Sequence, residues 1–142
     1  MPLTQPAPDV WTLLADIADE MPGATAFIHG ERTIAFGELL DCAARAAQGL
    51  ADLGVGPGDR VALWLPNVPA YPILYFACAR LGAIAVAVNT RYRAVEVADI
   101  VGRSGAKVLA CAPGFRRLDL PGSLCYRPAG LETASWPCPR SS

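Results

Sequence analysis

The chain has 142 residues, enough for one domain around a single buried core. Its formal net charge of −1 and its 18% of charged residues provide no basic surface for a nucleic acid, so we expect no nucleic-acid partner. His29 is the only histidine and the five cysteines contain no C-x-x-C pair, so we expect no metal site, and we interpret the cysteines as reduced core thiols.

The N-terminal segment is predicted to form a helix after a short extended start. Its first residues, MPLTQPAPDVW, lack the basic start and apolar core of a secretory signal, so we expect a cytoplasmic chain. Asp9 can cap a helix, which Pro22-Gly23 would end. The apolar residues of this helix recur at spacings of three and four: Val10, Leu13, Leu14, Ile17 and Met21.

A β-hairpin is predicted over residues 25–36, where two short β-prone runs flank Gly30-Glu31. His29 stands beside this turn. We expect it to be a solvated turn residue and not a catalytic base, because no Ser, Cys or carboxylate partner can be placed near it.

A helix over residues 36–53 leads into the most informative stretch, LGVGPGDRVALWLPN. Its predicted buried face consists of Phe36, Leu39, Leu40, Ala43, Ala47 and Leu50. Gly54 can close the helix in the left-handed conformation, and Pro57-Gly58 fits the centre of a type II turn. Residues 61–65 are apolar without alternation, which indicates a strand covered on both faces.

The glycines of this stretch, Gly54, Gly56 and Gly58, resemble a phosphate-binding loop only superficially. A dinucleotide fingerprint needs G-x-G-x-x-G between a strand and a following helix, whereas these glycines lie between a helix and a following strand. A small Rossmann-type nucleotide-binding protein is therefore the least favoured of three functional hypotheses.

Two further strand and helix segments follow. Asn67 is predicted to cap a helix that runs to Leu81, with Gly82 ending it before a strand over residues 83–88. A helix over residues 94–103 and a strand over residues 107–111 complete a βαβαβ pattern, which predicts an α/β fold with parallel strands. The apolar run over residues 71–88 is interrupted by Pro72, Arg80 and Gly82, so no membrane span is expected.

Ligands of open α/β sheets bind beyond the carboxyl ends of the strands, here Pro66-Asn67 and Asn89-Thr90-Arg91. We interpret Asn67 and Asn89 as caps or turn residues. Arg91 and Arg93 are interpreted as solvated or paired cations, and a direct ligand contact is the less favoured alternative for all four. Three aromatic residues could line an acyl pocket but are more typical of a core: Tyr71, Tyr75 and Phe76. No residue is assigned as catalytic, cofactor-binding or metal-binding.

Three segments, GVGPGDRVALWLPN, ARLGAIAVAVNTRY and SGAKVLA, resemble the N-terminal part of the adenylate-forming (AMP-binding) acyl-CoA synthetases, which include the fatty-acid–CoA ligases. The resemblance runs from about Thr25 to Cys111. It implies ATP-dependent, AMP-forming activation of a carboxylic or fatty acid and transfer of the acyl group to CoA, with ATP, Mg and CoA used by the complete enzyme.

The family's phosphate loop, acidic ribose-binding residue and catalytic lysine have no counterpart in this chain. Lys107 is the only lysine and matches the family's ordinary SGAK segment. Relatives commonly start the second helix with Thr-Tyr-x-Glu-Leu, in which Thr and Glu form a capping box. Ala35 stands at the Thr position, so the cap oxygen is missing, at an expected cost of about 1 kcal/mol.

The resemblance implies that residues 1–111 are the N-terminal part of a ligase large domain. Residues 112–142 are predicted to form an irregular Pro/Gly-rich tail, because their five prolines and three glycines leave no room for a long element. We hypothesise that truncation or a frameshift makes this tail non-native, and we expect the chain alone to be incomplete and inactive. The alternative is a non-catalytic remnant or interaction module that associates, or self-associates, through an exposed sheet edge.

Overall fold

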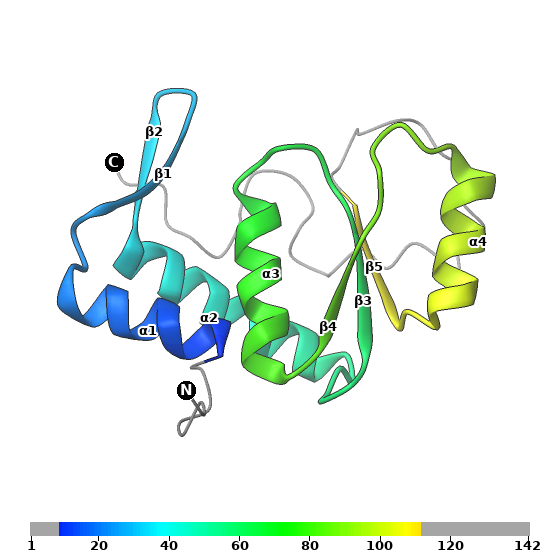
Figure 1. Cartoon of the computed structure of the whole chain (residues 1–142), viewed down its shortest axis with the longest axis horizontal. Coiled ribbons are helices and arrows are strands. Elements are labelled where there is room, and N and C mark those ends of the chain that lie inside the picture. Colours follow the sequence, from blue (N-terminus) through cyan, green and yellow to red (C-terminus); the bar gives the residue numbers. More distant parts are fainter. Residues whose placement is uncertain (1–8, 112–142) are drawn as a thin grey trace, which may run out of the picture.

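An N-terminal helix and a β-hairpin precede a parallel α/β unit in the computed structural model, which describes residues 9–111 (Figure 1). Helix α1 spans Val10–Glu20, and strands β1 (Thr25–His29) and β2 (Arg32–Ala35) pair antiparallel. The predicted helix, its Asp9 cap and the hairpin are confirmed. The interpretation of residues 112–142 as an irregular tail lies outside the described residues.

The predicted apolar face of α1 is only partly correct. Leu14 and Ala18 are buried, whereas Leu13 is 51% exposed and Met21 is 50% exposed. The helix lies at one end of the described fold and packs mainly against α2 and α3, so a narrow stripe of its surface suffices for this contact (Figure 1).

Helix α2 spans Phe36–Asp52 and ends as the sequence predicts. Gly54 has φ +87°, and the N–H of Val55 donates to the carbonyl of Leu50 at 3.1 Å. Gly58 has φ +78°, and the N–H of Asp59 donates to the carbonyl of Gly56 at 3.1 Å, as in a type II turn. These two turns connect the end of α2 to strand β3 (Arg60–Trp64).

Helix α3 spans Ala70–Leu81, and the prediction that Asn67 caps it is wrong. Its N-cap is Pro69, with no side-chain cap. Proline disfavours the helical conformation of the residue before it, so Val68 stays outside the helix. The N–H of Val68 instead donates to the carbonyl of Pro66 at 2.8 Å, which leaves Asn67 exposed in a loop.

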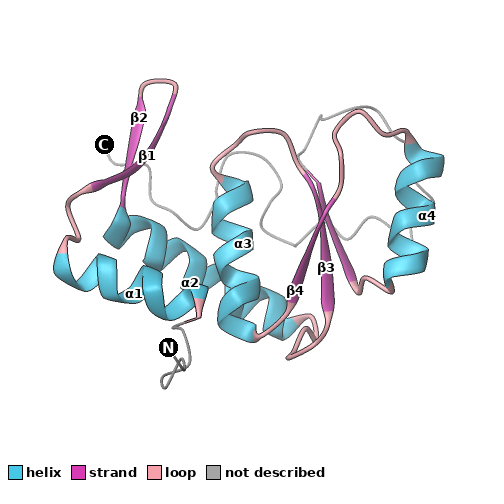
Figure 2. Ribbon diagram, viewed as in Figure 1, coloured by secondary structure: helices cyan, strands magenta, loops and turns pink. Residues whose placement is uncertain are grey.

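Strands β4 (Ile84–Ala87) and β5 (Val108–Cys111) flank β3 in the order β4-β3-β5, and both pair parallel with it (Figure 2). Helix α4 (Ala94–Ser104) connects β4 to β5, so the predicted βαβαβ pattern is confirmed. Gly82 and Gly105 end α3 and α4 with φ +67° and +64°.

The sheet separates two parts of the core. Val61 and Leu63 of β3 pack with buried residues of α2 and α3, whereas Ala62 and Trp64 pack with Val97 and Val101 of α4. Helices therefore cover both faces, which explains why β3 has no polar alternation. A third cluster joins the hairpin, α1, α2 and α3 through Leu14, Ile34, Leu39, Cys42 and Ile73.

Two buried cysteines differ from each other. Cys78 is a free thiol, and burial raises its pKa to about 11. Cys42 is disulfide-bonded, so the interpretation of all five cysteines as reduced thiols is wrong at this position. Among residues 9–111, no helix has both the length and the apolar character needed to cross a bilayer.

Candidate functional site

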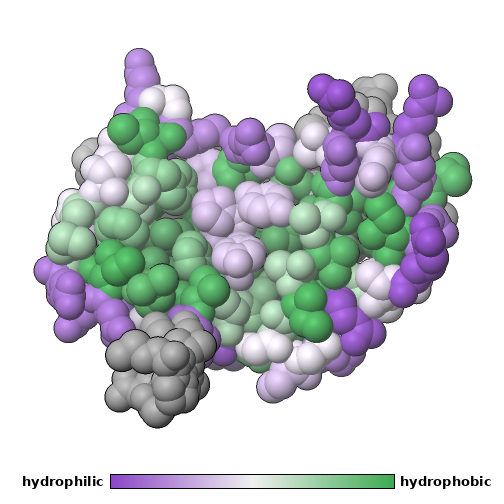
Figure 3. Space-filling view, in the orientation of Figure 1, coloured by the Kyte–Doolittle hydropathy of each residue, from purple (hydrophilic) through white to green (hydrophobic). Residues whose placement is uncertain are grey.

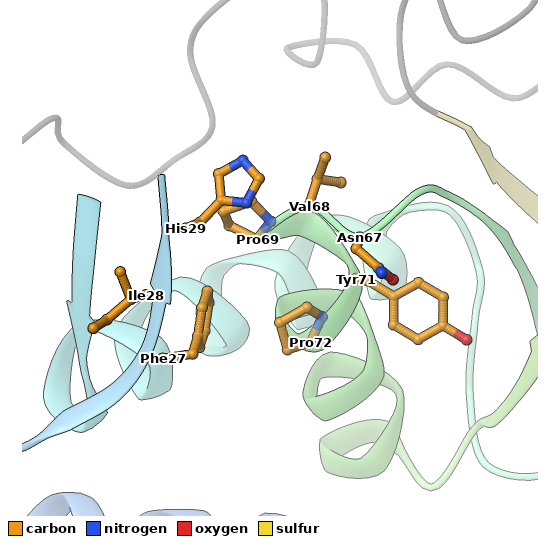
Figure 4. Close-up of a pocket in the computed structure, with 8 residues that line it drawn as sticks. All are labelled: Phe27, Ile28, His29, Asn67, Val68, Pro69, Tyr71 and Pro72. Carbon is orange, nitrogen blue, oxygen red and sulfur yellow. The ribbon is translucent and has the colours of Figure 1, made fainter. Parts of the chain in front are cut away.

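A cavity of about 260 Å³ lies between the hairpin and the start of α3 (Figure 4). One wall comes from the end of β1 and the other from the loop and first turn that follow β3. Its lining is mainly apolar, with three polar side chains: Phe27, Ile28, His29, Asn67, Val68, Pro69, Tyr71 and Pro72.

The two walls are held together by the third core cluster, because Phe27 of β1 packs against the group that includes Ile73 of α3. Pro69 and Pro72 stiffen the second wall, since each fixes its own φ. The cavity thus arises from contact between segments about forty residues apart in the chain.

The polar side chains of the cavity are His29, Asn67 and Tyr71, and none of them hydrogen-bonds to another group in the described part of the chain. Figure 4 shows Asn67 and Tyr71 near one another on the α3 side and His29 over Pro69. No Ser, Cys or carboxylate among the described residues lines the cavity, so it lacks a nucleophile and base pair. This arrangement can bind an amphipathic group but offers no proton-transfer pair.

The carboxyl ends of β3 and β4 lie next to each other, as the sequence predicts. Trp64 Nε1 donates to the carbonyl of Asn89 at 3.2 Å, and the Asn89 side chain accepts the N–H of Arg91 at 2.9 Å. Asn89 is therefore a turn residue, as interpreted. Arg91 and Arg93 are exposed, and Figure 3 shows hydrophilic side chains gathered over the region before α4.

The structure brings only two of the predicted ligand-edge and acyl-pocket residues into the cavity, Asn67 and Tyr71. Tyr75 and Phe76 form an edge-to-face pair with ring centroids 5.6 Å apart, and Phe76 packs against the third core cluster. The other lining residues escaped sequence reasoning, because a pocket between a hairpin and a helix start has no sequence period.

A second polar cluster lies at the amino ends of the strands. Lys107 Nζ donates to Asp59 Oδ2 at 2.8 Å and to the carbonyl of Gly54 at 3.3 Å. Arg60 Nε donates to the carbonyl of Ser104 at 2.8 Å. The hydrogen bond from Lys107, with one from the Gly56 N–H, lowers the pKa of Asp59. Lys107, just before β5, is therefore hydrogen-bonded to both ends of the turn segment between α2 and β3.

The described residues do not fit a triphosphate or a metal ion at the glycine-rich turn. The N–H of Gly56 already donates to the Asp59 carboxylate at 2.8 Å, and this carboxylate would repel a phosphate. Within residues 9–111, no group of three or more His, Cys, Asp or Glu side chains is arranged to hold a metal ion.

The family model for the AMP-binding enzymes matches residues 14–133. The chain is 40% identical over 121 residues to a methyl-dioxo-octahydroindenyl propanoyl:CoA ligase of Mycobacterium tuberculosis, a match covering 85% of this chain and 22% of the relative. It is 45% identical over 92 residues to a feruloyl-CoA synthase of an Amycolatopsis species, covering 65% and 19% of the two chains. The chain spans about a fifth of the length of these relatives.

A solved structure of a fatty acyl-CoA synthetase from Mycobacterium tuberculosis superimposes on this chain with a TM-score of 0.75. The two are 28% identical, and the match covers 94% of this chain and 30% of the other. The predicted resemblance in sequence thus has a counterpart in the fold.

Proposed function

The chain belongs to the family of AMP-binding enzymes, and from this premise we propose that it supplies the opening part of an acid–CoA ligase. Such an enzyme joins a carboxylic acid to ATP and releases pyrophosphate. It then passes the acyl group from the adenylate to the thiol of CoA and releases AMP. The match of the family model over residues 14–133 is the observation that carries this proposal.

The names of the relatives support a carboxylic acid as substrate. One is a feruloyl-CoA synthase and another is a long-chain-fatty-acid–CoA ligase. The complete enzyme would therefore use a fatty or aryl acid, ATP, Mg and CoA, and we place it in the cytoplasm. Residues 1–111 would be the N-terminal part of its large domain.

The described residues would serve as scaffold in this enzyme. The glycine-rich turn is occupied by Asp59, and the only lysine of the chain, Lys107, is engaged by that same carboxylate. During adenylation, negative charge builds up on the phosphates of ATP, and it has to be stabilised by backbone amides, cations and Mg²⁺. We therefore propose that the 142-residue chain alone does not catalyse the reaction.

A chimera tests the family function directly. Residues 25–111, over which the sequence resembles the family, would replace the corresponding segment of the feruloyl-CoA synthase, and acid-dependent release of pyrophosphate from ATP would be measured. We expect the chimera to keep activity, because the segment supplies scaffold. A folded chimera that has lost all turnover would contradict the proposal.

The same assay on the purified 142-residue chain tests its incompleteness. We expect no acid-dependent pyrophosphate release with a panel of fatty and aryl acids, while the intact feruloyl-CoA synthase serves as the positive control. Robust turnover by the chain alone would show that its residues hold the full machinery.

One observation favours a second candidate, an interaction module that associates through its sheet edge. Strand β4 borders the parallel sheet, and Ile84 at its start is 52% exposed. Unpaired strand edges are common sites of association with another chain. This candidate needs no catalytic group.

A further inference from the structure

The two edges of the parallel sheet differ in how well they are covered. Along β5, Val108, Leu109 and Ala110 are only 2–4% exposed. Along β4, Ile84 is 52% exposed and Ala87 is also exposed. Both β4 and β5 border the described sheet, and the side chains of β4 are the more exposed of the two.

Within residues 9–111, the outer side of β4 has backbone groups that no neighbouring strand pairs with. The N–H of Ile84 donates to the carbonyl of Asp59 at 2.7 Å, and the N–H of Val88 donates to the carbonyl of Leu63 at 3.0 Å. Successive residues of a strand direct their N–H and C=O groups to alternate sides, so those of Ala85 and Ala87 point away from β3. Each of these two residues therefore offers one donor and one acceptor to a further strand.

The side chains around this edge do not protect it. Exposed edges are usually blocked by Lys, Pro or an inward charge. Residues 82–88 have the sequence GAIAVAV, which contains no charge and no proline.

We propose that a second copy of this chain pairs with this edge, β4 against β4, antiparallel about a two-fold axis at Val86. This inference rests on the second candidate function and names its partner. In this register Ala85 of one copy lies opposite Ala87 of its partner, and every outward N–H meets an outward C=O. The two sheets become one continuous sheet.

Three features favour a second copy over an unrelated strand. The spacing of outward groups at Ala85 and Ala87 is self-complementary under two-fold symmetry. The absence of charge over residues 82–88 removes repulsion between two identical edges. The register also places exposed Ile84 opposite Val88 of the second copy, so an apolar side chain exposed in the single chain becomes covered.

Sedimentation equilibrium of the full chain over a range of concentrations tests the proposal. We expect a monomer–dimer equilibrium that Ile84→Lys weakens by at least about tenfold, because a charge on an edge strand opposes pairing. Val95→Lys is the matched control, since Val95 lies on α4 and is 82% exposed. This control should leave the dissociation constant unchanged.

Ala87→Pro is the second variant, and it removes an N–H that points away from β3. Circular dichroism would establish that each variant is folded. In a third variant, Val86→Cys, oxidation should cross-link the dimer across the axis beyond the level seen for the unmodified chain. If Ile84→Lys fails to fold, the other two variants still test the pairing. Ala87→Pro should abolish the dimer, and Val86→Cys should cross-link it.

The outcomes separate this inference from the candidate function on which it rests. A chain that stays monomeric at every concentration overturns both. A dimer that is unaffected by Ile84→Lys and Ala87→Pro, and that Val86→Cys does not cross-link, keeps association but overturns its assignment to β4. Neither result bears on the ligase activity of the chimera.

Discussion

The Asp59 carboxylate links Lys107 to the turn that precedes β3. It accepts hydrogen bonds from Lys107 Nζ and from the Gly56 N–H, both at 2.8 Å, and these bonds lower its pKa from the ordinary value of 3.8. A carboxyl group whose pKa is lower in the folded state stabilises the fold above the unfolded pKa. This contribution is lost as the pH falls through the folded pKa.

Asp59→Asn should therefore destabilise the chain at neutral pH, and the difference from wild type should shrink as the pH falls below about 4. Urea unfolding followed by circular dichroism at several pH values measures this. Asp19→Asn is the control, because Asp19 is exposed on the surface of α1. A difference for Asp59→Asn that does not change with pH would contradict the prediction.

Contacts of Asn67 and His29 explain why two sequence-based predictions were wrong or incomplete. Asn67 has the chemistry of a helix cap, but Pro69 two positions later keeps Val68 out of the helix and moves its start. His29, predicted to be a solvated turn residue, is exposed and also lines the cavity. Its neighbours there come from α3 and the loop before it, and local sequence contains no sign of that contact.

At the scale of elements, the ends of the helices were predictable because glycines mark them. Gly54, Gly82 and Gly105 each have positive φ just beyond a helix, which costs glycine little. The strands were predictable as unbroken apolar runs, and their parallel pairing followed from the crossover rule. The cavity was not predictable in this way, since it depends on how the hairpin packs against α3.

Two glycines at α4 should respond oppositely to alanine. Gly102 lies within the helix, and a methyl group added there would meet open space, so Gly102→Ala should stabilise the fold by about 0.5–1 kcal/mol. At Gly105, φ is +64° and a Cβ would lie 2.7 Å from the Arg60 guanidinium, so Gly105→Ala should cost about 1–2 kcal/mol. Urea unfolding of both variants tests this, and effects of the same sign would contradict it.

The start of α2 shows why a missing cap need not be costly. Ala35 has no cap oxygen, but the N–H of Phe36 donates to the carbonyl of Ala24 and that of Gly37 to the carbonyl of Pro22, both at 3.0 Å. The preceding loop thus satisfies two of the free donors of the first turn. The expected cost of about 1 kcal/mol assumed that these backbone donors have no other acceptor, whereas the two loop carbonyls accept them.

Ala35→Ser should accordingly add less than about 0.5 kcal/mol to the free energy of unfolding, below the usual gain from a serine cap. Asp9→Ala is the comparison, because the Asp9 side chain accepts the N–H of Thr12 at 2.7 Å and no carbonyl replaces it in the same way among the described residues. The Asp9 variant should be clearly destabilised. A gain of about 1 kcal/mol or more from Ala35→Ser would show that the loop carbonyls do not substitute for a cap.

At the scale of the whole molecule, β3 joins the parts of the fold on either side of the sheet. Its side chains alternate between the core under α2 and α3 and the core under α4, and both neighbouring strands pair with it. The hairpin and α1 attach to this unit through α2 and α3. Loss of packing in β3 should therefore affect the entire parallel unit, whereas a change on an outer helix surface should stay local.

Leu63→Ala tests this central role of β3. Leu63 is 0% exposed, and truncating a fully buried leucine typically costs about 2–5 kcal/mol. Val95→Ala is the control, because its side chain is 82% exposed and such changes usually stay within about 0.5 kcal/mol. Hydrogen exchange should show faster exchange of the β4 and β5 amides in Leu63→Ala, since both strands depend on β3 for their partners. If exchange quickened only beside position 63, the parallel sheet would not open as one cooperative unit, and β3 would be one packing element among several.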